Sequence, residues 1–499
     1  MKLNISFFYF NCLFLCSFLN HAQELNALVL DSLNQQPIPF ASVYLKSGSG
    51  VVSNEEGRFG LRYNAQEAIK DSLFISCMGY ETLGIQLKEV QDSIFYLTPK
   101  AIALNSVILS NKEVNVKAII KQIKENIPAK YELGYTRKKF FFRETGSQEF
   151  KALNVKIKKT SIAEFNQTFW DSTLQKVPRK NEWYQEFAGT LYGNFSEENQ
   201  KLELDKALDL EDKEASAIFD NIEQVFDTIL KENVKTTSYF KIRSGIIGGK
   251  MEADDFPISE QEKDTLSQEE KDKIEKSRFL TLRKRVTVNL LNNVFEEEEL
   301  NFSVIKKSSK YTYTLLDFTY FGDTPIYVLQ FEPDGNTDFA GKIYVDADQM
   351  TLIRLEYKNT QNIRDFSMLG VSFALDLQEI VIQFKKLNNG KYGLEFLEFS
   401  SGFKGGFERP LVITEKNKVV KGRNKQNQLK MDLDVKNRQY QKYQLVVFET
   451  VPISQEDFNA YEENPTILPV NLSEYDPSFW EGYSIIEPNQ AIKAFKLIK

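Results

Sequence analysis

The chain has 499 residues, of which 42% are hydrophobic, and this length is enough for more than one packed domain. Its formal charge of −7 excludes a chain-wide basic surface of the kind that binds nucleic acid, so no nucleic-acid partner is expected. Aromatic residues make up 13% of the chain, and they favour strands because half-buried pleated faces accept rings well. We therefore expect a fold that is mainly β with some α.

The N-terminus, residues 1–22, has the pattern of a secretory signal peptide. Lys2 precedes an apolar stretch from Ile5 to Leu19, which is shorter than the roughly 20 residues that a membrane-spanning helix needs. The small residue Ala22 predicts cleavage before Gln23. A lipoprotein signal ending at Cys16 is the alternative, but the residue before this cysteine is not small. We expect an exported protein of the periplasm or of the outer membrane and cell surface.

Cleavage at this position restricts the chemistry that the mature protein can perform. His21 is the only histidine, and it leaves with Cys12 and Cys16. Catalysis by Ser-His-Asp or Cys-His groups and histidine-containing zinc sites are therefore excluded. The sequence also lacks a Walker A loop, a dinucleotide glycine pattern and a Gly-x-Ser-x-Gly elbow. Cys77 lies in an apolar strand, where a buried inert thiol is favoured over a reactive one.

Residues 24–107 contain evenly spaced short strands separated by turn residues, which is typical of a β-sandwich. Gly57 lies in a tight turn where a positive φ is tolerated, and we expect Phe59, two residues later, to lie in the core. The expected strands are Leu25–Leu30, Phe40–Lys46, Phe59–Tyr63 and Ser72–Cys77.

Four segments of this region match one known family in order and spacing: Leu28–Asp31, Pro37–Val43, Val52–Phe59 and Leu73–Tyr80. Together they resemble the carboxypeptidase-regulatory-like domain, with the departure that Ala27 stands where the family usually has glycine. The resemblance implies a prealbumin-like β-sandwich that is an accessory domain and not the peptidase. In that family the domain often begins bacterial envelope proteins, including TonB-dependent transporters, but no transporter-sized barrel follows here.

The second region, 113–499, begins with a helical pattern. Apolar residues at helical spacing predict an amphipathic helix from Val114 to Ile127, ended by Pro128, and a second helix from about Leu210 to Lys231. The first helix is followed by an aromatic-Arg-Glu strand, Phe140–Glu144. This helix and strand together resemble the start of the main region in other exported proteins with the same sandwich. The resemblance implies no particular chemistry. The segment 252–276 is dense in charge and predicts an exposed excursion, partly helical or disordered.

After Phe279 the chain is rich in strands up to Pro452 and predicts an antiparallel meander. The segment Gly341–Arg354 resembles a strand pair of lipoprotein-carrier half-barrels. We expect one curved antiparallel sheet from about Arg137 to Pro452, with both helices packed on it, in a large antiparallel β-rich α+β region of half-barrel geometry. The expected meander strands are Tyr311–Leu316, Ile326–Phe331, Lys342–Asp346, Leu352–Tyr357 and Val371–Phe384.

Three segments are candidates for sites, and each has a simpler structural interpretation. Asp334–Asp338 has oxygen ligands at alternate positions, as a calcium loop does, but lacks its glycine and its final glutamate, so a hairpin loop is favoured. Glu296–Glu299 is a run of acids that suits a solvated loop better than a cation site. The aromatic segment Tyr475–Tyr483 predicts a docking tail on the sheet, with a ligand-facing cluster as the alternative. We assign no catalytic, cofactor-binding or metal-binding residue, and we expect no cofactor.

Three functions remain open. The favoured one is a non-catalytic cell-envelope protein in which the sandwich is an adaptor. The β-rich region is then a scaffold, or it binds an envelope protein or an apolar ligand. Association with the outer membrane is compatible with this function. The alternatives are a hydrolase that uses two carboxylates about 5 to 9 Å apart and a small outer-membrane β-barrel. The charged excursions and the final Lys499 argue against the barrel.

Overall fold

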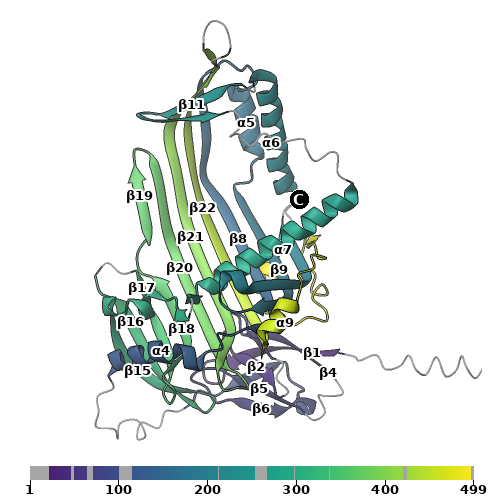
Figure 1. The fold of residues 1–499 in the computed structure, drawn as a ribbon, viewed down its shortest axis with the longest axis vertical. Helices are drawn as coiled ribbons and strands as arrows, with labels where there is room; N and C mark the ends of the chain where they lie inside the picture. The colour runs from purple at the N-terminus through teal and green to yellow at the C-terminus, as the bar shows by residue number, and fades with distance from the viewer. Residues whose placement is uncertain are drawn as a thin grey trace, which may run out of the picture.

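A computed structural model describes residues 22–46, 50–64, 71–100, 115–211, 213–235, 237–252, 267–296, 298–335, 338–417, 419 and 424–495. A small β-sandwich lies at one end of a tall sheet, and helices pack along that sheet (Figure 1). Residues 1–21 of the predicted signal peptide lie outside the described residues. Its last residue, Ala22, is the first residue of strand β1.

The sandwich consists of two small sheets, with strand orders β4-β1-β7 and β3-β2-β5-β6. One pairing differs from the antiparallel expectation, because β1 and β7 run parallel. The predicted end of the sandwich at Val107 lies outside the described residues. Its elements are β1 (Ala22–Asp31), β2 (Ser42–Leu45), β3 (Gly50–Val52), β4 (Arg58–Asn64), β5 (Ser72–Ser76), β6 (Leu83–Gln86), the 3₁₀ helix η1 (Leu87–Glu89) and β7 (Ile94–Leu97).

Phe59 lies in the core of the sandwich, as its sequence context predicts. Its side chain is 1% exposed and stacks on Phe95, with ring centroids 6.0 Å apart. The turn before it requires glycine: Gly57 has a φ of +75°, and a Cβ there would lie 2.6 Å from the carbonyl oxygen of Val29. The turn and the buried ring together explain why these residue types stand two positions apart.

We expect Phe59→Ala to lower the free energy of unfolding by about 3 to 5 kcal/mol, because it removes a large ring from a packed core. The matched control is Tyr96→Ala in β7 of the same sheet, since the Tyr96 side chain is 49% exposed. Its expected cost is within about 0.5 kcal/mol. Urea denaturation of both variants measures the difference, and equal stabilities would show that the Phe59 ring contributes nothing to the core.

The second region forms one sheet of 14 strands, which runs from Thr136 to Pro452 apart from the short β23. Its pairings are antiparallel, as predicted, except that β23 runs parallel to β10. The main path is open, in the order β15-β16-β17-β18-β20-β21-β22-β8-β9-β10-β23. The strands are β8 (Thr136–Thr160), β9 (Lys180–Gly193), β10 (Gln200–Glu211), β11 (Tyr239–Ser244), β12 (Ile247–Glu252), β15 (Tyr311–Phe321), β16 (Thr324–Pro333), β17 (Phe339–Asp346), β18 (Thr351–Asn359), β19 (Arg364–Met368), β20 (Val371–Lys386), β21 (Tyr392–Lys416), β22 (Lys425–Pro452) and β23 (Val470–Leu472).

Four neighbouring strands, β20, β21, β22 and β8, extend far beyond the rest of the sheet and form a tall blade (Figure 1). The longest, β22, has 28 residues, which corresponds to about 90 Å at the usual rise of a strand. We call the sheet face that carries Leu397 and Leu445 the inner face, and the face that carries Phe396 and Val446 the outer face.

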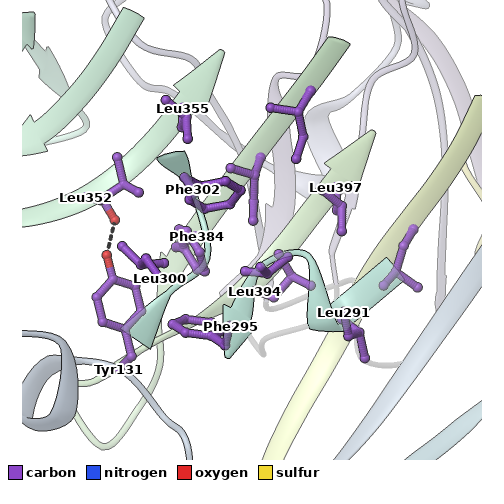
Figure 2. Packing of buried hydrophobic residues seen from close by; sticks show 14 of the residues in the cluster. Tyr131, Leu291, Phe295, Leu300, Phe302, Leu352, Leu355, Phe384, Leu394 and Leu397 are labelled. Atoms are coloured by element: carbon purple, nitrogen blue, oxygen red, sulfur yellow. Dashed lines mark hydrogen bonds between the residues drawn. The ribbon is translucent and has the colours of Figure 1, made fainter. Parts of the chain in front are cut away.

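The inner face is filled at the base of the blade by other parts of the same chain. Phe295 and Leu300 of a short hairpin and Phe302 just after it are buried against Phe384 and Leu394 of the sheet (Figure 2). The Tyr131 hydroxyl, which follows α4, donates to the carbonyl of Leu352 at 2.7 Å. The elements that cover this face are α4 (Val116–Lys130), α7 (Gln268–Asn292), β13 (Phe295–Glu296), β14 (Glu299–Leu300) and α8 (Ser303–Lys306).

Two predicted helix boundaries are corrected. Pro128 does not end the first helix, which continues to Lys130; proline lacks an N–H but tolerates the helical φ near a helix end, and the Tyr131 N–H still bonds the Ile127 carbonyl. The predicted start Val114 lies outside the described residues. Leu210 belongs to strand β10, and the second helix is α6 (Lys213–Asn233). Alternating buried residues in β10 outweigh the helical pattern there.

At the distal end of the blade, α6 and α5 (Gln167–Lys176) pack on the sheet through a small aromatic core. The rings of Phe165, Phe169, Trp170 and Phe226 all contact one another, with centroids 5.3 to 6.4 Å apart. The remaining short elements are η2 (Glu197–Asn199), η5 (Ser308–Lys310), α9 (Gln455–Ala460) and α10 (Gln490–Lys493).

The charged excursion, 252–276, is described only in part, because 253–266 lie outside the described residues. Its last residues begin α7, where Ser267 and Glu270 form a capping box. The start of this helix is exposed, as predicted, whereas its second half is buried against the sheet through residues such as Leu290 and Leu291.

Candidate functional site

The outer face of the sheet contains a buried ion pair. Arg143 and Glu186 are each 1% exposed, and the guanidinium Nε donates to Glu186 Oε1 at 2.5 Å. The indole Nε1 of Trp480 donates to the second carboxylate oxygen, also at 2.5 Å. Both oxygens of Glu186 are therefore bonded, which offsets the cost of removing the carboxylate from water.

The ion pair also holds the C-terminal segment, residues 475–495, against the sheet. The Nη2 group of Arg143 donates to the carbonyl of Ile486 at 2.8 Å, and Asn54 of the sandwich donates to the carbonyl of Glu487 at 3.1 Å. The sandwich residue Val52 belongs to the same apolar cluster as Trp480. Sheet, C-terminal segment and sandwich thus share one packed interface.

A second polar group joins the sandwich directly to the sheet. Ser42 and Gln383 both donate to Glu395 Oε2, at 2.9 and 2.8 Å. Arg354 donates to Gln383 Oε1 at 2.8 Å, and the Phe40 ring stacks on Phe396 with centroids 4.8 Å apart. These contacts fix the sandwich on the outer face at the base of the blade.

Beside this interface lies the candidate site, a cleft of about 1380 Å³ between the sandwich and the large sheet. Tyr44 and Phe74, on the outer side of β2 and β5, line it with stacked rings 5.5 Å apart. The opposite wall comes from the turn after β15, from the β20–β21 turn and from the end of β22. Lining residues there include Phe321, Asp323, Lys386, Asn388, Glu449 and Thr450.

Four of the charged groups that line the cleft have partners: Lys139, Lys385, Glu395 and Glu449. Glu449 lies 3.6 Å from Lys139 and 3.6 Å from Arg137, and Glu395 accepts the two hydrogen bonds described above. Lys385 donates to the carbonyl of Phe448 at 3.1 Å. Burial raises the pKa of the Tyr44 hydroxyl, and the nearby Glu395 raises it further. The cleft therefore presents aromatic rings and amide groups among paired charges.

The sequence candidates lie elsewhere and do not converge on this cleft. Cys77 lies near Arg354 at the sandwich interface, and burial raises the pKa of its thiol to about 11, so it is protonated at neutral pH. Among the described residues, no three Asp, Glu, Cys or His side chains are close enough together to hold a metal ion.

Asp334 belongs to the turn between β16 and β17, where it accepts a hydrogen bond from Thr312 at 2.7 Å; Asn336 and Thr337 lie outside the described residues. Of the acidic run Glu296–Glu299, Glu296 and Glu299 pair with each other across the β13–β14 hairpin, and Glu297 lies outside the described residues. Glu296 also pairs with Lys306. The hairpin serves the core, since Phe295 and Leu300 on either side of the run are buried.

The aromatic segment Tyr475–Tyr483 docks on the sheet, as the first of its two interpretations expects. Trp480 is 1% exposed and packs edge-on against Phe141, with ring centroids 5.2 Å apart. Its neighbour Tyr483 reaches the cleft wall. The segment is therefore mainly structural and contributes one edge of the candidate site.

Sequence reasoning missed the buried charged residues, among them Arg143 and Lys138. Burial lowers the pKa of Lys138 to about 8, and its ammonium lies 5.1 Å from the centroid of the Phe195 ring. The available signal for Arg143 was its place directly after the apolar run Phe140–Phe142. Lys138 is separated from this run by the exposed Lys139, so it had no such signal. A charge that borders such a run in a central strand has to find a buried partner.

With the geometry established, comparison with known proteins identifies the first domain. The sandwich is a carboxypeptidase-regulatory-like domain. Residues 28–109 match the family model described as "CarboxypepD_reg-like domain", and this regulatory-like sandwich is not itself a catalytic fold. The match covers the region in which the sequence segments resemble that family.

For the rest of the chain the comparisons are less informative. No curated protein is detectably similar in sequence. Among solved structures, the chain is similar to one titled "Crystal structure of MucB in complex with MucA(peri)", at 7% identity and a TM-score of 0.16, over 64% of this chain and 94% of that chain. No described helix is both long enough and apolar enough to cross a membrane.

We expect Arg143→Ala to lower the free energy of unfolding by about 3 to 5 kcal/mol, because it leaves the Glu186 carboxylate buried without its cation. The control is Arg137→Ala on the same strand, whose partner Glu449 is 43% exposed, with an expected cost of at most about 1 kcal/mol. Thermal and urea unfolding measure both. Equal effects would show that the buried pair does not hold the interface.

A pH dependence is expected at Asp209 in β10. Burial raises the pKa of this carboxyl to about 6 from 3.8, with Arg283 nearby opposing the rise. The neutral carboxyl of Asp209 therefore stabilises the folded state relative to the ionised one. This contribution to stability is fully present below pH 3.8, the usual pKa, and is lost as the pH rises through 6, the pKa in the folded state. We expect Asp209→Asn to be more stable than the natural chain by about 1 to 2 kcal/mol at pH 7.5, and equal to it near pH 4. A stability difference that does not change between these pH values would contradict the assignment.

Proposed function

We propose that this chain is a non-catalytic cell-envelope adaptor that binds an extended segment of a partner protein in the cleft between the sandwich and the large sheet. The observation that carries this proposal is the contrast between the two concave regions at the base of the blade. The inner face is filled by the chain's own side chains, whereas the cleft on the other side is open and has a stacked aromatic pair.

The filled inner face argues against an apolar ligand as cargo there. An acyl-chain carrier needs an apolar cavity lined by residues such as Phe, Leu and Ile. Here Phe295, Leu300 and Phe302 take the place that such a ligand would have, and each is at most 2% exposed. Their removal from the sheet would expose a large apolar surface, so the hairpin acts as part of the core.

The lining of the cleft suits a polypeptide. Tyr44 and Phe74 offer apolar area with a hydroxyl at its edge, a combination common at the centre of protein interfaces. Lys386 and Asn388 on the opposite wall supply donors for backbone carbonyls. The fixed position of the sandwich keeps these two walls apart, which lowers the ordering cost of binding.

The absence of catalysis is part of the proposal. The mature chain predicted from the sequence has no histidine. Of the acids that line the cleft, Glu395 and Glu449 are bonded to donors rather than to each other. Burial raises the pKa of a third, Asp205, and the nearby Lys139 opposes this rise. A pair of carboxylates that divide the roles of acid and base needs one free group with a raised pKa. Glu395 and Glu449 do not form such a pair.

Site-specific photo-crosslinking tests the cleft. A photoreactive amino acid at Tyr44 should give a discrete cross-linked protein in intact cells, because this ring lines the cleft. The control position is Leu33, which is 79% exposed on a turn of the same sandwich. Phe74→Ala should weaken the Tyr44 cross-link without changing thermal stability by more than about 1 kcal/mol. Identical products from both positions, or none from Tyr44, would reject the cleft as a partner site.

A further inference from the structure

Two β-hairpins meet end to end on one edge of β21, far from the cleft. The β19–β20 hairpin pairs with β21 as far as Phe407, and the β11–β12 hairpin takes over the same edge from Val412 onward. Their turns, at Leu369–Gly370 and Gly245–Ile246, face each other across the short interval between these residues (Figure 1).

Arg409 connects the two turns. Its Nη2 group donates to the carbonyl of Ser244 at 2.8 Å, and its Cγ would lie 3.0 Å from a Cβ placed on Gly370. The adjacent Glu408 N–H donates to the Gly370 carbonyl at 2.7 Å. The two hairpin tips are therefore held side by side, and we call their apolar residues the tip patch: Ile246, Ile247, Phe366, Met368, Leu369 and Phe373.

The tip patch is unusually exposed for residues of this size. Ile246 is 92% exposed, and the other five side chains are 43 to 55% exposed. The strand register places Phe373, Met368 and Ile247 on the inner face of the sheet. Ile246 and Leu369 lie at the two turns. Several large apolar side chains gathered at one protruding point mark an interaction surface.

The outer face at the same level has the opposite character. Lys404 lies 2.7 Å from Asp376, Lys436 lies 2.9 Å from Glu408, and Lys158 lies 2.9 Å from Asp432. These pairs make that face a solvated one, as antiparallel sheets commonly have. The distal blade is thus amphipathic. On its apolar side α5 and α6 pack over Leu429 of β22, and the six residues of the tip patch remain exposed.

The charges at the tips favour an anionic ligand. Lys241, Arg243 and Lys250 lie in the β11–β12 hairpin, on the side of it that faces away from Ile247, because Lys241 and Arg243 pair with Thr414 and Val412 of β21. Lys241 and Arg243 are exposed. Arg409 is 8% exposed and bonds a backbone carbonyl, and the described residues place no carboxylate within ion-pair distance of its guanidinium.

We propose that the tip patch inserts into the interface of a lipid bilayer, with the neighbouring basic side chains bound to anionic headgroup phosphates. Protruding turn residues suit a bilayer surface, because they enter the headgroup and acyl boundary without a complementary pocket. Basic side chains beside them add attraction to anionic lipids. A second copy of the chain is the competing occupant, but the clustered positive charge of the tips opposes pairing with itself.

Vesicle binding tests this with the full-length mature chain. We expect co-sedimentation with vesicles of phosphatidylcholine containing about 30% phosphatidylglycerol, weaker binding to phosphatidylcholine alone, and weaker binding as salt is raised. The triple variant Ile246→Ser, Met368→Ser, Leu369→Asn should lower the partition coefficient at least tenfold. Asn is chosen because Leu369 has a φ of +51°, which Asn tolerates well.

The control is Leu33→Ser, an apolar residue on the sandwich that is 79% exposed, and this variant should bind vesicles as the natural chain does. The pair Lys241→Gln, Arg243→Gln should weaken binding about five- to tenfold on anionic vesicles only. Melting curves confirm that each variant is folded. Absence of binding by the natural chain, unchanged binding by the triple variant, or a dimer in solution that the triple variant abolishes would each overturn the proposal. The cleft and its partner are not involved, so the cross-linking experiment at Tyr44 stands or fails separately.

Discussion

The buried pair of Arg143 and Glu186 is the interaction on which the arrangement of the molecule depends. Two charges removed from water are stabilising only when every remaining hydrogen-bonding group finds a partner. Here the partners are Trp480 and the carbonyl of Ile486, both from the C-terminal segment. The pair therefore cannot be satisfied until this segment has docked. Docking in turn brings Glu487 to Asn54 of the sandwich. The buried carboxylate therefore positions the sandwich together with the direct Ser42–Glu395 contact.

The two faces of the sheet are completed by different means. At the base, the inner face is covered by helices and by the hairpin around Phe295, and the outer face by the sandwich and by Trp480. Farther along the blade the outer face is solvated by charge. The inner face is apolar, and α5 and α6 cover it around Leu429 of β22 but leave the hairpin tips uncovered. A β-bulge near Leu375 and Leu377 keeps apolar residues of β20 on the inner face along its length, because one extra residue restores the alternation. The tip patch is thus continuous with the face that forms the main core.

Sequence patterns predicted the local structure better than the long-range contacts. Alternation such as Ile343 and Val345 identified the meander strands, and the segments around Phe59 identified the sandwich, because both signals lie within a few residues. The Arg143–Glu186 pair is separated by 43 residues and depends on the register of β8 with β9, which no local pattern specifies. The Phe295 hairpin was hidden because its acidic turn dominates the composition of that segment. The cleft forms between walls that are more than 200 residues apart in sequence, so its lining required the folded chain.

The blade gives the two proposed surfaces a fixed separation. Tyr392, at the base of β21, lines the cleft, and Arg409 joins the hairpin tips on the same strand. Arg409 lies 17 positions after Tyr392, which corresponds to about 55 Å of extended strand. Because β21 is bonded along this stretch to β22 on one side and largely to β20 on the other, it bends little. In the proposed arrangement, a molecule whose tips lie in a bilayer holds its cleft some tens of ångströms from that surface. This distance suits an adaptor that captures a partner away from the membrane, and it explains why long continuous strands serve better here than a flexible linker.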